Sequence, residues 1–241
     1  MRKIINIEDR YQEITFRYLY KQDQKYDKVM FFFHGFNGNR YAIDIEWIER
    51  ILEKGYLLVI LDAENHGDRM SDEYKRLDNS NRQKLIIETE INTANDAKKI
   101  YAYLLEKDVI NNDMLLAVMG VSMGGAIALY LTTIFKKIQI LVSLIGSPSF
   151  VEFYKYKQKV YKFENNQEYK KRLDKYAKID PLLNYHLFSG RKILLTGGSR
   201  DKIVPMIYAE ELSKKIEAIF IVYDLEHEVS KEMMEDVYKF I

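Results

Sequence analysis

The stretch from Leu115 to Ala128, LLAVMGVSMGGAIA, constrains this chain more than any other part of the sequence. It begins with five apolar residues and no polar alternation, which is typical of a strand covered on both faces of a parallel sheet. The pentapeptide Gly120-Val121-Ser122-Met123-Gly124 follows at once, and small apolar residues then begin a helix. A strand, a G-x-S-x-G turn and a helix in this order predict a nucleophile elbow with Ser122 at its tip.

The two glycines of this pentapeptide have a physical reason. A serine on so sharp a turn needs unusual backbone angles, and a side chain at either glycine would collide with the neighbouring strand or helix. The turn would also bring the backbone N–H of Met123 to the start of the new helix, where it can donate to a developing oxyanion. A bare G-x-S-x-G also occurs by chance or for tight packing, so the interpretation depends on partner residues elsewhere.

Strand and helix patterns alternate along the rest of the chain. Apolar runs predict further buried strands at 28–33, 56–61, 138–145, 191–195 and 218–223. The segments between them have helical spacing and the connections are short. This alternation predicts an α/β fold with a mostly parallel, doubly wound sheet flanked by helices.

Three other segments give more specific expectations. Residues 14–20 alternate and are rich in β-forming residues, so we expect an antiparallel strand at the edge of the sheet. Residues 41–53 fit an amphipathic helix that turns Ile45, Ile48 and Leu52 inward. Residues 70–82 are polar and aperiodic, which predicts an exposed excursion without regular structure.

The stretch from Phe150 to Lys178 differs in composition from its surroundings. It is dense in Tyr, Phe and Lys, and its interrupted helical spacing predicts two short helices. We interpret it as a small helical cap, inserted at about 149–180 into a single domain that spans residues 1–241. Plain surface helices with solvated lysines would have the same composition. A lid would instead line an acyl or aryl pocket with its aromatic side chains and mildly favour anionic substrates.

Two later loops complete a candidate catalytic triad. In an open parallel sheet the loops after the strands share one edge, and ligand sites form there. His227 follows the last predicted strand and Asp201 follows the strand before it, which gives the chain order Ser, Asp, His. We expect Ser122 to be the nucleophile, His227 the general base, and Asp201 the carboxylate that orients the imidazole.

Few histidines compete with His227. The chain has four, of which His34 and His66 precede the elbow and His186 lies near the end of the predicted cap. The place of His66 directly after an early strand favours a structural role in that loop over a role as a base.

The rival acids are also few. Asp224 and Glu226 are so close to His227 in sequence that neither reaches the imidazole comfortably. Asp180 precedes a proline at the end of the predicted cap, where it would terminate a helix.

Composition excludes several kinds of chemistry. The absence of cysteine excludes disulfides, a thiol nucleophile and thiolate metal sites. A formal net charge of +1 gives no general attraction to nucleic acid or membrane. The N-terminus is too charged for a signal-peptide core, and no apolar run approaches the roughly 20 residues of a membrane span, so we expect a cytoplasmic protein. The sequence leaves the oligomeric state open, with a homodimer as one option.

Three further motifs carry a resemblance to a known family. Residues 34–39, His-Gly-Phe-Asn-Gly-Asn, resemble the oxyanion loop of feruloyl (cinnamoyl) esterases, and residues 198–205, with Gly-Ser-Arg-Asp and Val-Pro, resemble an acid loop. Asn65-His66-Gly67 resembles a loop that usually has Gly-His-Gly after an arginine, and both the Asn and the missing Arg depart from that pattern. Over nearly its whole length the chain resembles the α/β-hydrolase superfamily. It is similar in particular to small bacterial carboxylesterases related to dienelactone hydrolase and to the prolyl oligopeptidase catalytic domain.

This resemblance implies a function and completes the site. It implies a serine hydrolase that cleaves small-molecule carboxylic esters through an acyl-enzyme intermediate and needs no cofactor or metal. The backbone N–H groups of Phe36 and Met123 would form the oxyanion hole. A short-peptide peptidase or a thioesterase could use the same triad, and a binding protein could keep the fold without turnover.

Overall fold

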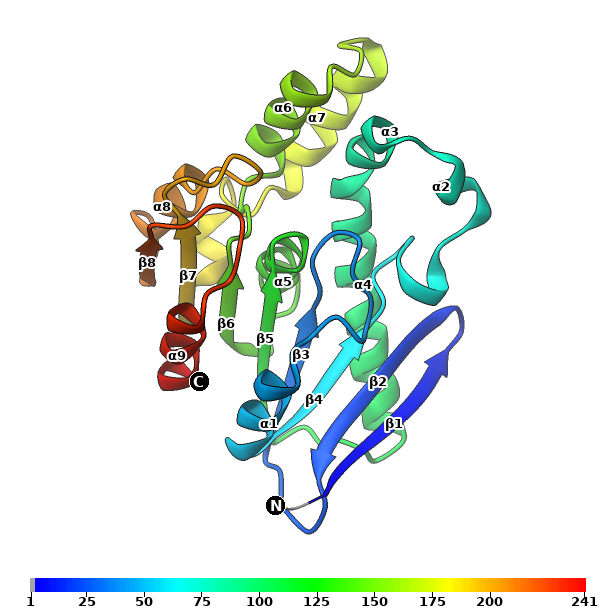
Figure 1. Ribbon diagram of the computed structural model, residues 1–241, viewed down its shortest axis with the longest axis vertical. Helices are drawn as coiled ribbons and strands as arrows, with labels where there is room; N and C mark the ends of the chain where they lie inside the picture. The colour runs from blue at the N-terminus through cyan, green and yellow to red at the C-terminus, as the bar shows by residue number, and fades with distance from the viewer. Residues whose placement is uncertain (1–2) are drawn as a thin grey trace.

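The computed structural model describes residues 3–241, and an eight-stranded sheet runs through them (Figure 1). The strands, in chain order, are β1 (Ile4–Tyr11), β2 (Ile14–Lys21), β3 (Lys28–Phe33), β4 (Tyr56–Leu61), β5 (Leu115–Val121), β6 (Ile138–Leu144), β7 (Lys192–Gly198) and β8 (Ile219–Tyr223). Their order across the sheet is β1-β2-β4-β3-β5-β6-β7-β8, and every pair from β4 to β8 is parallel. The predicted α/β fold with a mostly parallel sheet is therefore confirmed.

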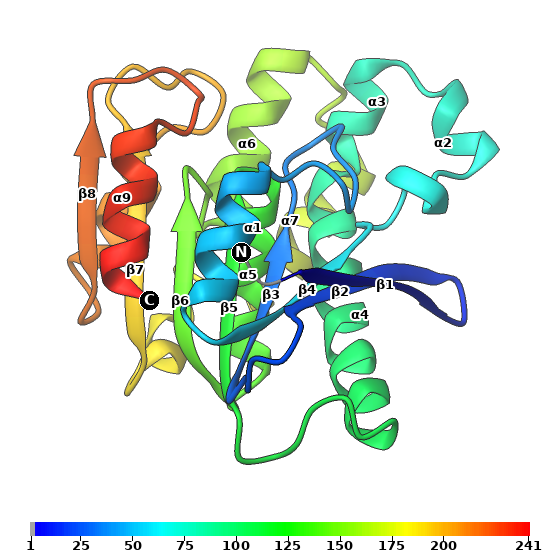
Figure 2. The same ribbon diagram turned by 60° about the horizontal axis from the view of Figure 1, so that its bottom comes forward.

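Helices cover both faces of this sheet (Figure 2). They are α1 (Ile45–Glu53), α2 (Asp72–Arg76), α3 (Asn79–Lys84), α4 (Ile86–Glu106), α5 (Met123–Ile134), α6 (Phe150–Tyr161), α7 (Gln167–Ile179), α8 (Ile207–Ser213) and α9 (Lys231–Phe240), with short 3-10 turns at Gly67–Arg69 and Tyr185–Phe188. Helices α1 and α9 pack on one face, while α4 and α5 pack on the other. No helix within residues 3–241 is long and apolar enough to cross a membrane.

The prediction of an edge strand at residues 14–20 is wrong in one respect. Strand β2 is antiparallel, but it pairs with β1 on one side and with β4 on the other, so β1 forms the edge. A tight turn joins β1 to β2, with Gln12 at a φ of 56°. Strand β1 is only half-buried, and Asn6 and the charged residues 8–10 interrupt its apolar residues, which hides it from a search for apolar runs.

The helix predicted over residues 41–53 begins later than expected. Its N-cap is Asp44, whose Oδ1 accepts a hydrogen bond from the N–H of Glu46 at 2.8 Å. Ile48 and Leu52 are buried as predicted, but Ile45 is 62% exposed. The prediction that Ile45 points inward is wrong because the first turn of α1 projects beyond the sheet that the later turns cover.

Residues 70–82 are also more ordered than predicted. They contain α2 and most of α3, capped by the side chains of Ser71 and Asp78. The ring of Tyr74 is buried, so the segment is not a plain exposed excursion. Short capped helices of five or six residues have too few apolar positions to give a periodic signal.

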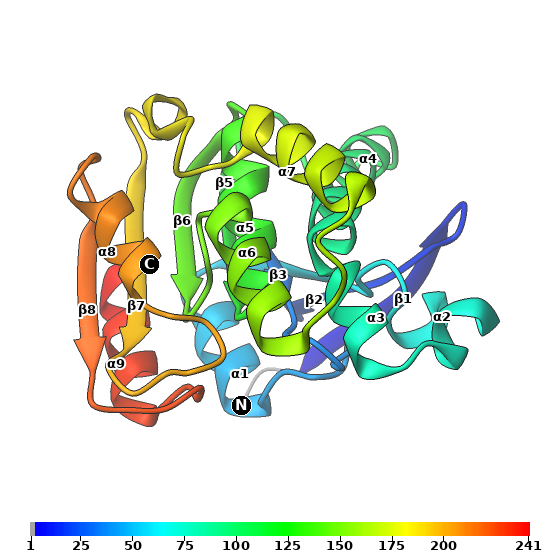
Figure 3. The ribbon, with the colours of Figure 1, turned by 90° about the horizontal axis from the view of Figure 1, so that it is seen from above.

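Helices α6 and α7 lie above the carboxyl ends of the central strands (Figure 3). Both helices agree with the two predicted for this stretch. The buried carboxylate of Asp180, at the end of α7, accepts hydrogen bonds from the Ser149 hydroxyl at 3.0 Å and from the N–H of Val151 at 2.9 Å. Asp180 thus joins the end of α7 to the start of α6. That the pair acts as a cap remains a prediction.

Candidate active site

Ser122 occupies the sharp turn between β5 and α5. Its φ of 56° and ψ of −115° lie in a region that residues with a side chain rarely adopt. Such a conformation costs on the order of 1–3 kcal/mol and persists only where the surroundings enforce it. Here the N–H of Ser122 donates to the carbonyl of Leu144 on β6 at 2.8 Å, which holds the turn in place.

The glycines around Ser122 leave no room for side chains. A Cβ atom on Gly120 would lie 2.1 Å from the carbonyl oxygen of Gly124. A Cβ atom on Gly124 would lie 2.0 Å from the carbonyl oxygen of Phe33 on β3. The collisions predicted from the sequence are therefore present, with the new helix in one case and the neighbouring strand in the other.

Ser122, His227 and Asp201 form one chain of hydrogen bonds. Ser122 Oγ lies 2.7 Å from His227 Nε2, and His227 Nδ1 lies 2.6 Å from Asp201 Oδ2. A carboxylate can only accept, so the imidazole proton belongs on Nδ1 and Nε2 is free to accept the serine hydroxyl. The arrangement can take a proton from Ser122 and return it to a leaving group, although the catalytic roles themselves remain predictions.

The surroundings of Asp201 favour its ionised form. Burial alone would raise the pKa of this carboxyl group, but hydrogen bonds outweigh burial and lower the pKa below its usual range. They come from His227 on Oδ2 and from the N–H groups of Ile203 at 2.8 Å and Val204 at 3.0 Å on Oδ1. Asp201 therefore remains a carboxylate at neutral pH and can stabilise a protonated imidazole.

Phe36 and Met123, whose backbone N–H groups are the predicted oxyanion donors, lie beside the same cavity as Ser122. All three residues line one cavity of about 620 Å³. Neither N–H donates a hydrogen bond to any atom within residues 3–241. Met123 is also the first residue of α5, so its N–H lies at the positive end of that helix. Unpaired donors at one cavity are consistent with an oxyanion hole, and that role stays a prediction.

Arg40 is a contributor that sequence reasoning missed. It follows the predicted oxyanion loop directly, and its Nη1 lies 2.5 Å from Oδ2 of the buried Asp62. Its backbone N–H donates to the other oxygen of Asp62 at 2.6 Å, and its guanidinium also pairs with Glu8 and Asp68. This network ties the loop at 34–39 to the end of β4. In the sequence, Arg40 is visible only as an arginine next to the loop. A solvated surface arginine at this position would look the same, so the sequence does not reveal the network.

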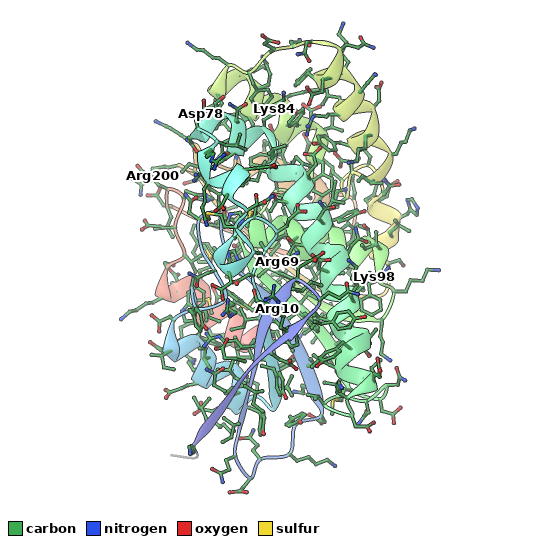
Figure 4. All side chains as sticks on the ribbon, turned by 90° about the vertical axis from the view of Figure 1, so that its right-hand side faces the viewer. Arg10, Arg69, Asp78, Lys84, Lys98 and Arg200 are labelled. Atoms are coloured by element: carbon green, nitrogen blue, oxygen red, sulfur yellow. The ribbon has the colours of Figure 1, made fainter. Side chains whose placement is uncertain are left out.

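A second arginine supports the loop at residues 65–67. Arg69, labelled in Figure 4, donates to the carbonyl of Asp62 at 3.0 Å and pairs with Asp96 of α4 at 2.5 Å. Arg69 and Arg40 therefore both act on Asp62. The family pattern places its arginine before this loop, whereas here one arginine follows the loop and the other lies 22 residues upstream of Asp62.

The remaining histidines lie outside the hydrogen-bonded chain. His34 and His66 are buried, and burial lowers the pKa of His34 to about 4 and also lowers that of His66. Both are therefore neutral near pH 7. His34 Nε2 accepts a hydrogen bond from the N–H of Ala63 at 3.1 Å, and the His66 ring packs against Phe36. They support the loops, while His186 is exposed.

The rival acids are engaged elsewhere. Asp224 pairs with Arg200 at 2.9 Å and accepts from the hydroxyl of Ser199. Asp180 holds the base of α6 and α7. No group of three or more His, Asp or Glu side chains within residues 3–241 is placed to hold a metal ion.

Comparison with known proteins gives matches in sequence and in structure. The family described as "BAAT / Acyl-CoA thioester hydrolase C terminal" matches residues 98–219. The candidate esterase YitV of Bacillus subtilis (strain 168) is 26% identical over 203 residues, which cover 80% of this chain and 76% of YitV.

Three solved structures resemble the fold. TT1662 from Thermus thermophilus has a TM-score of 0.74 and 16% identity, and the match covers 99% of this chain and 96% of TT1662. Acetyl xylan esterase 1 from Thermoanaerobacterium sp. JW/SL YS485 has a TM-score of 0.71 and 16% identity, and the match covers 100% of this chain and 87% of the esterase. The acylaminoacyl peptidase of Pyrococcus horikoshii has a TM-score of 0.75 and 14% identity, covering 96% of this chain and 38% of the peptidase. At these identities the likeness concerns the fold alone.

Proposed function

Because the chain belongs to the BAAT / acyl-CoA thioester hydrolase C-terminal family, within the α/β-hydrolase superfamily, we propose that it is a serine hydrolase of carboxylic esters. One observation carries the proposal. Ser122 and His227, which are hydrogen-bonded to each other, line a cavity of about 620 Å³, and Asp201 holds the far side of the imidazole. Phe36 and Met123 line the same cavity, and their backbone N–H groups have no partner within residues 3–241. A scaffold protein without turnover would have no need of this arrangement.

The geometry supports a two-step reaction. His227 Nε2 takes the proton of Ser122 as Oγ attacks the substrate carbonyl, and the N–H groups of Phe36 and Met123 stabilise the oxyanion. The imidazolium then protonates the leaving alcohol, which departs and leaves an acyl-enzyme. Water, with the same histidine as base, then attacks the acyl carbon. The bond to Ser122 Oγ breaks, Oγ regains a proton from the imidazolium, and the carboxylic acid leaves, while Asp201 remains ionised throughout. No step requires a metal or an organic cofactor.

The cavity wall is suited to an acyl group of small or medium size. Apolar side chains from several elements line it, namely Phe32, Trp47, Ile86, Phe153, Ile203 and Val229. YitV is named as an esterase, which favours oxygen esters. The family description names thioester hydrolases, so thioesters are the second candidate class, and the triad treats both carbonyls alike.

A fluorophosphonate probe followed by a substrate panel tests the proposal. We expect one covalent label per chain, on the peptide that contains Ser122, and measurable hydrolysis of p-nitrophenyl esters with two to eight acyl carbons. Acyl-CoA thioesters of the same chain lengths form the second arm. A folded protein that neither reacts with the probe nor cleaves either series would be a binding protein, and faster cleavage of the thioesters would assign thioesterase activity.

Substitution of Phe36 tests the oxyanion hole. Phe36→Pro removes the backbone N–H, so we expect kcat to fall by about 10²–10³-fold, as for loss of one oxyanion donor. Phe36→Ala keeps the N–H and loses only the ring that packs on His66, so kcat should fall far less. Steady-state kinetics on one aryl ester compares the two, and thermal unfolding checks that both variants fold. Equal losses in folded variants would remove Phe36 from the oxyanion hole.

A further inference from the structure

A group of polar side chains lines the same cavity, and the proposed mechanism uses none of it. Gln83 from α3, Glu90 from α4 and Lys157 from α6 contribute to one wall. Glu90 is only 1% exposed and Lys157 only 3% exposed. Ionisable side chains are rarely buried this deeply unless they are paired, so their role needs an explanation.

Lys157 lacks an acceptor for its ammonium group. Within residues 3–241 its Nζ makes no hydrogen bond and no ion pair. Its neighbours are the ring faces of Phe153 at 4.7 Å and Tyr161 at 5.4 Å, which also line the cavity. Ring faces attract a cation but cannot accept three N–H bonds in full. The ammonium of this cavity-lining side chain is therefore free to pair with an anionic group of a ligand in the cavity.

The neighbouring acid does not neutralise Lys157. Neither carboxyl oxygen of Glu90 has a hydrogen-bond partner within the described residues, and Glu90 and Lys157 form no ion pair. Burial raises the pKa of Glu90 well above its usual range, against the opposing effect of Lys157. Burial lowers the pKa of Lys157 to about 8, which leaves most molecules charged at pH 7. The wall therefore offers an ammonium group and a carboxyl O–H.

This wall lies within electrostatic reach of the triad. The carboxylate of Asp201 acts on Lys157 and raises the pKa of its ammonium group against the effect of burial. The oxygen Oε1 of Gln83, in the same wall, also lacks a partner among residues 3–241. A substrate whose carbonyl lies at Ser122 can thus extend a polar end to Lys157 within one cavity.

We propose that Lys157, assisted by Glu90, binds a carboxylate of the substrate, so that the preferred substrates are anionic esters. The carboxylate can belong to the acyl part, as in a half-ester of a dicarboxylic acid, or to the alcohol part, as in an ester of a hydroxy acid. The Lys157 ammonium and the Glu90 O–H would both donate to it. The inference rests on the proposed hydrolase function and assigns the substrate class of that site.

Binding without turnover tests the inference directly. In the Ser122→Ala background the esters persist, and Trp47, the only tryptophan of the chain, lines the cavity and reports their binding by fluorescence. One pair of ligands is phenyl hemiglutarate and neutral phenyl valerate, for the acyl part. The other pair is 3-acetoxybenzoate and phenyl acetate, for the alcohol part. We expect the anionic member of at least one pair to bind about tenfold more tightly or better.

Substitution of Lys157 then locates this preference. Lys157→Met removes the charge and keeps an unbranched side chain that is one atom shorter, so the anionic ligand should lose its advantage over the neutral ligand. The matched control is Lys155→Met, two residues away on α6, because the side chain of Lys155 is 44% exposed and pairs with Glu152. It should leave both affinities unchanged.

The outcomes separate this inference from the proposed function. Equal affinity for the charged and neutral ligands in the Ser122→Ala protein overturns the inference, whatever the folding of the Lys157 variant. A preference that survives in a folded Lys157→Met protein also overturns it. If the protein with Ser122 cleaves neutral esters and the Ser122→Ala protein binds charged and neutral ligands equally, the hydrolase function is supported and the carboxylate site is excluded. If the protein with Ser122 cleaves no ester but the Ser122→Ala protein binds the anionic ligand more tightly, the carboxylate site is supported and the hydrolase function is excluded.

Discussion

Replacement of Ser122 with alanine is expected to lower kcat for an aryl ester by about 10⁵–10⁶-fold, as for loss of the nucleophile in comparable triads. The remaining groups, the two backbone N–H donors and the cavity, would still bind the ester and polarise its carbonyl. They would leave a residual rate of about 10³–10⁴ over the reaction in water. Measurement of p-nitrophenyl butyrate hydrolysis, with fluorophosphonate labelling in parallel, checks both the loss of turnover and the loss of the covalent adduct.

The fold should survive this substitution. Alanine keeps a Cβ atom at the positive φ of position 122, so the backbone is no more strained than with serine. Ser199→Ala is the matched control, because the Ser199 hydroxyl contacts only Asp224 at the surface. A Ser122→Ala protein that unfolds at the same temperature and still cleaves the ester at the rate of the Ser199→Ala control would exclude Ser122 as the nucleophile.

The elements that position the site could be predicted because their signals are local. Strands β3 and β4 match the predicted ranges to the residue, since each is a continuous apolar run buried on both faces. The elbow could be predicted because its glycines stand where a side chain would collide with the backbone of the neighbouring helix or strand. That Ser122, Asp201 and His227 lie together could be expected because the loops after the strands of a parallel sheet share one edge.

The supporting contacts could not be predicted because they join residues far apart in the chain. Arg40 meets Asp62 only when β3 and β4 lie side by side. Lys157 lies in a lysine-rich stretch that reads as a solvated helix face, and only the docking of α6 beside α3 and α4 buries it. Whether a charge faces water or a cavity is decided by tertiary packing, which a single sequence does not encode locally.

Asp201→Asn is expected to lower kcat by about 10⁴-fold while the protein remains folded. The asparagine oxygen can still accept from the N–H groups of Ile203 and Val204, which keeps the acid loop in place. Its amide NH₂ would then face His227 Nδ1 as a donor, where the carboxylate was an acceptor. The imidazole proton would move to Nε2, and Nε2 could no longer accept the hydroxyl proton of Ser122. Steady-state kinetics at neutral pH, together with thermal unfolding, measures this loss.

Asp224→Asn is the matched control for the same substitution. Asp224 is exposed, pairs with Arg200 and makes no contact with His227, so the change should remove a surface ion pair worth about 0–1 kcal/mol and leave kcat nearly unchanged. The contrast isolates the carboxylate that orients the imidazole, because both variants replace one acid in neighbouring loops. A severe loss in Asp224→Asn with a mild loss in Asp201→Asn would transfer the orienting role to Asp224, and it would require the loop after β8 to rearrange before catalysis.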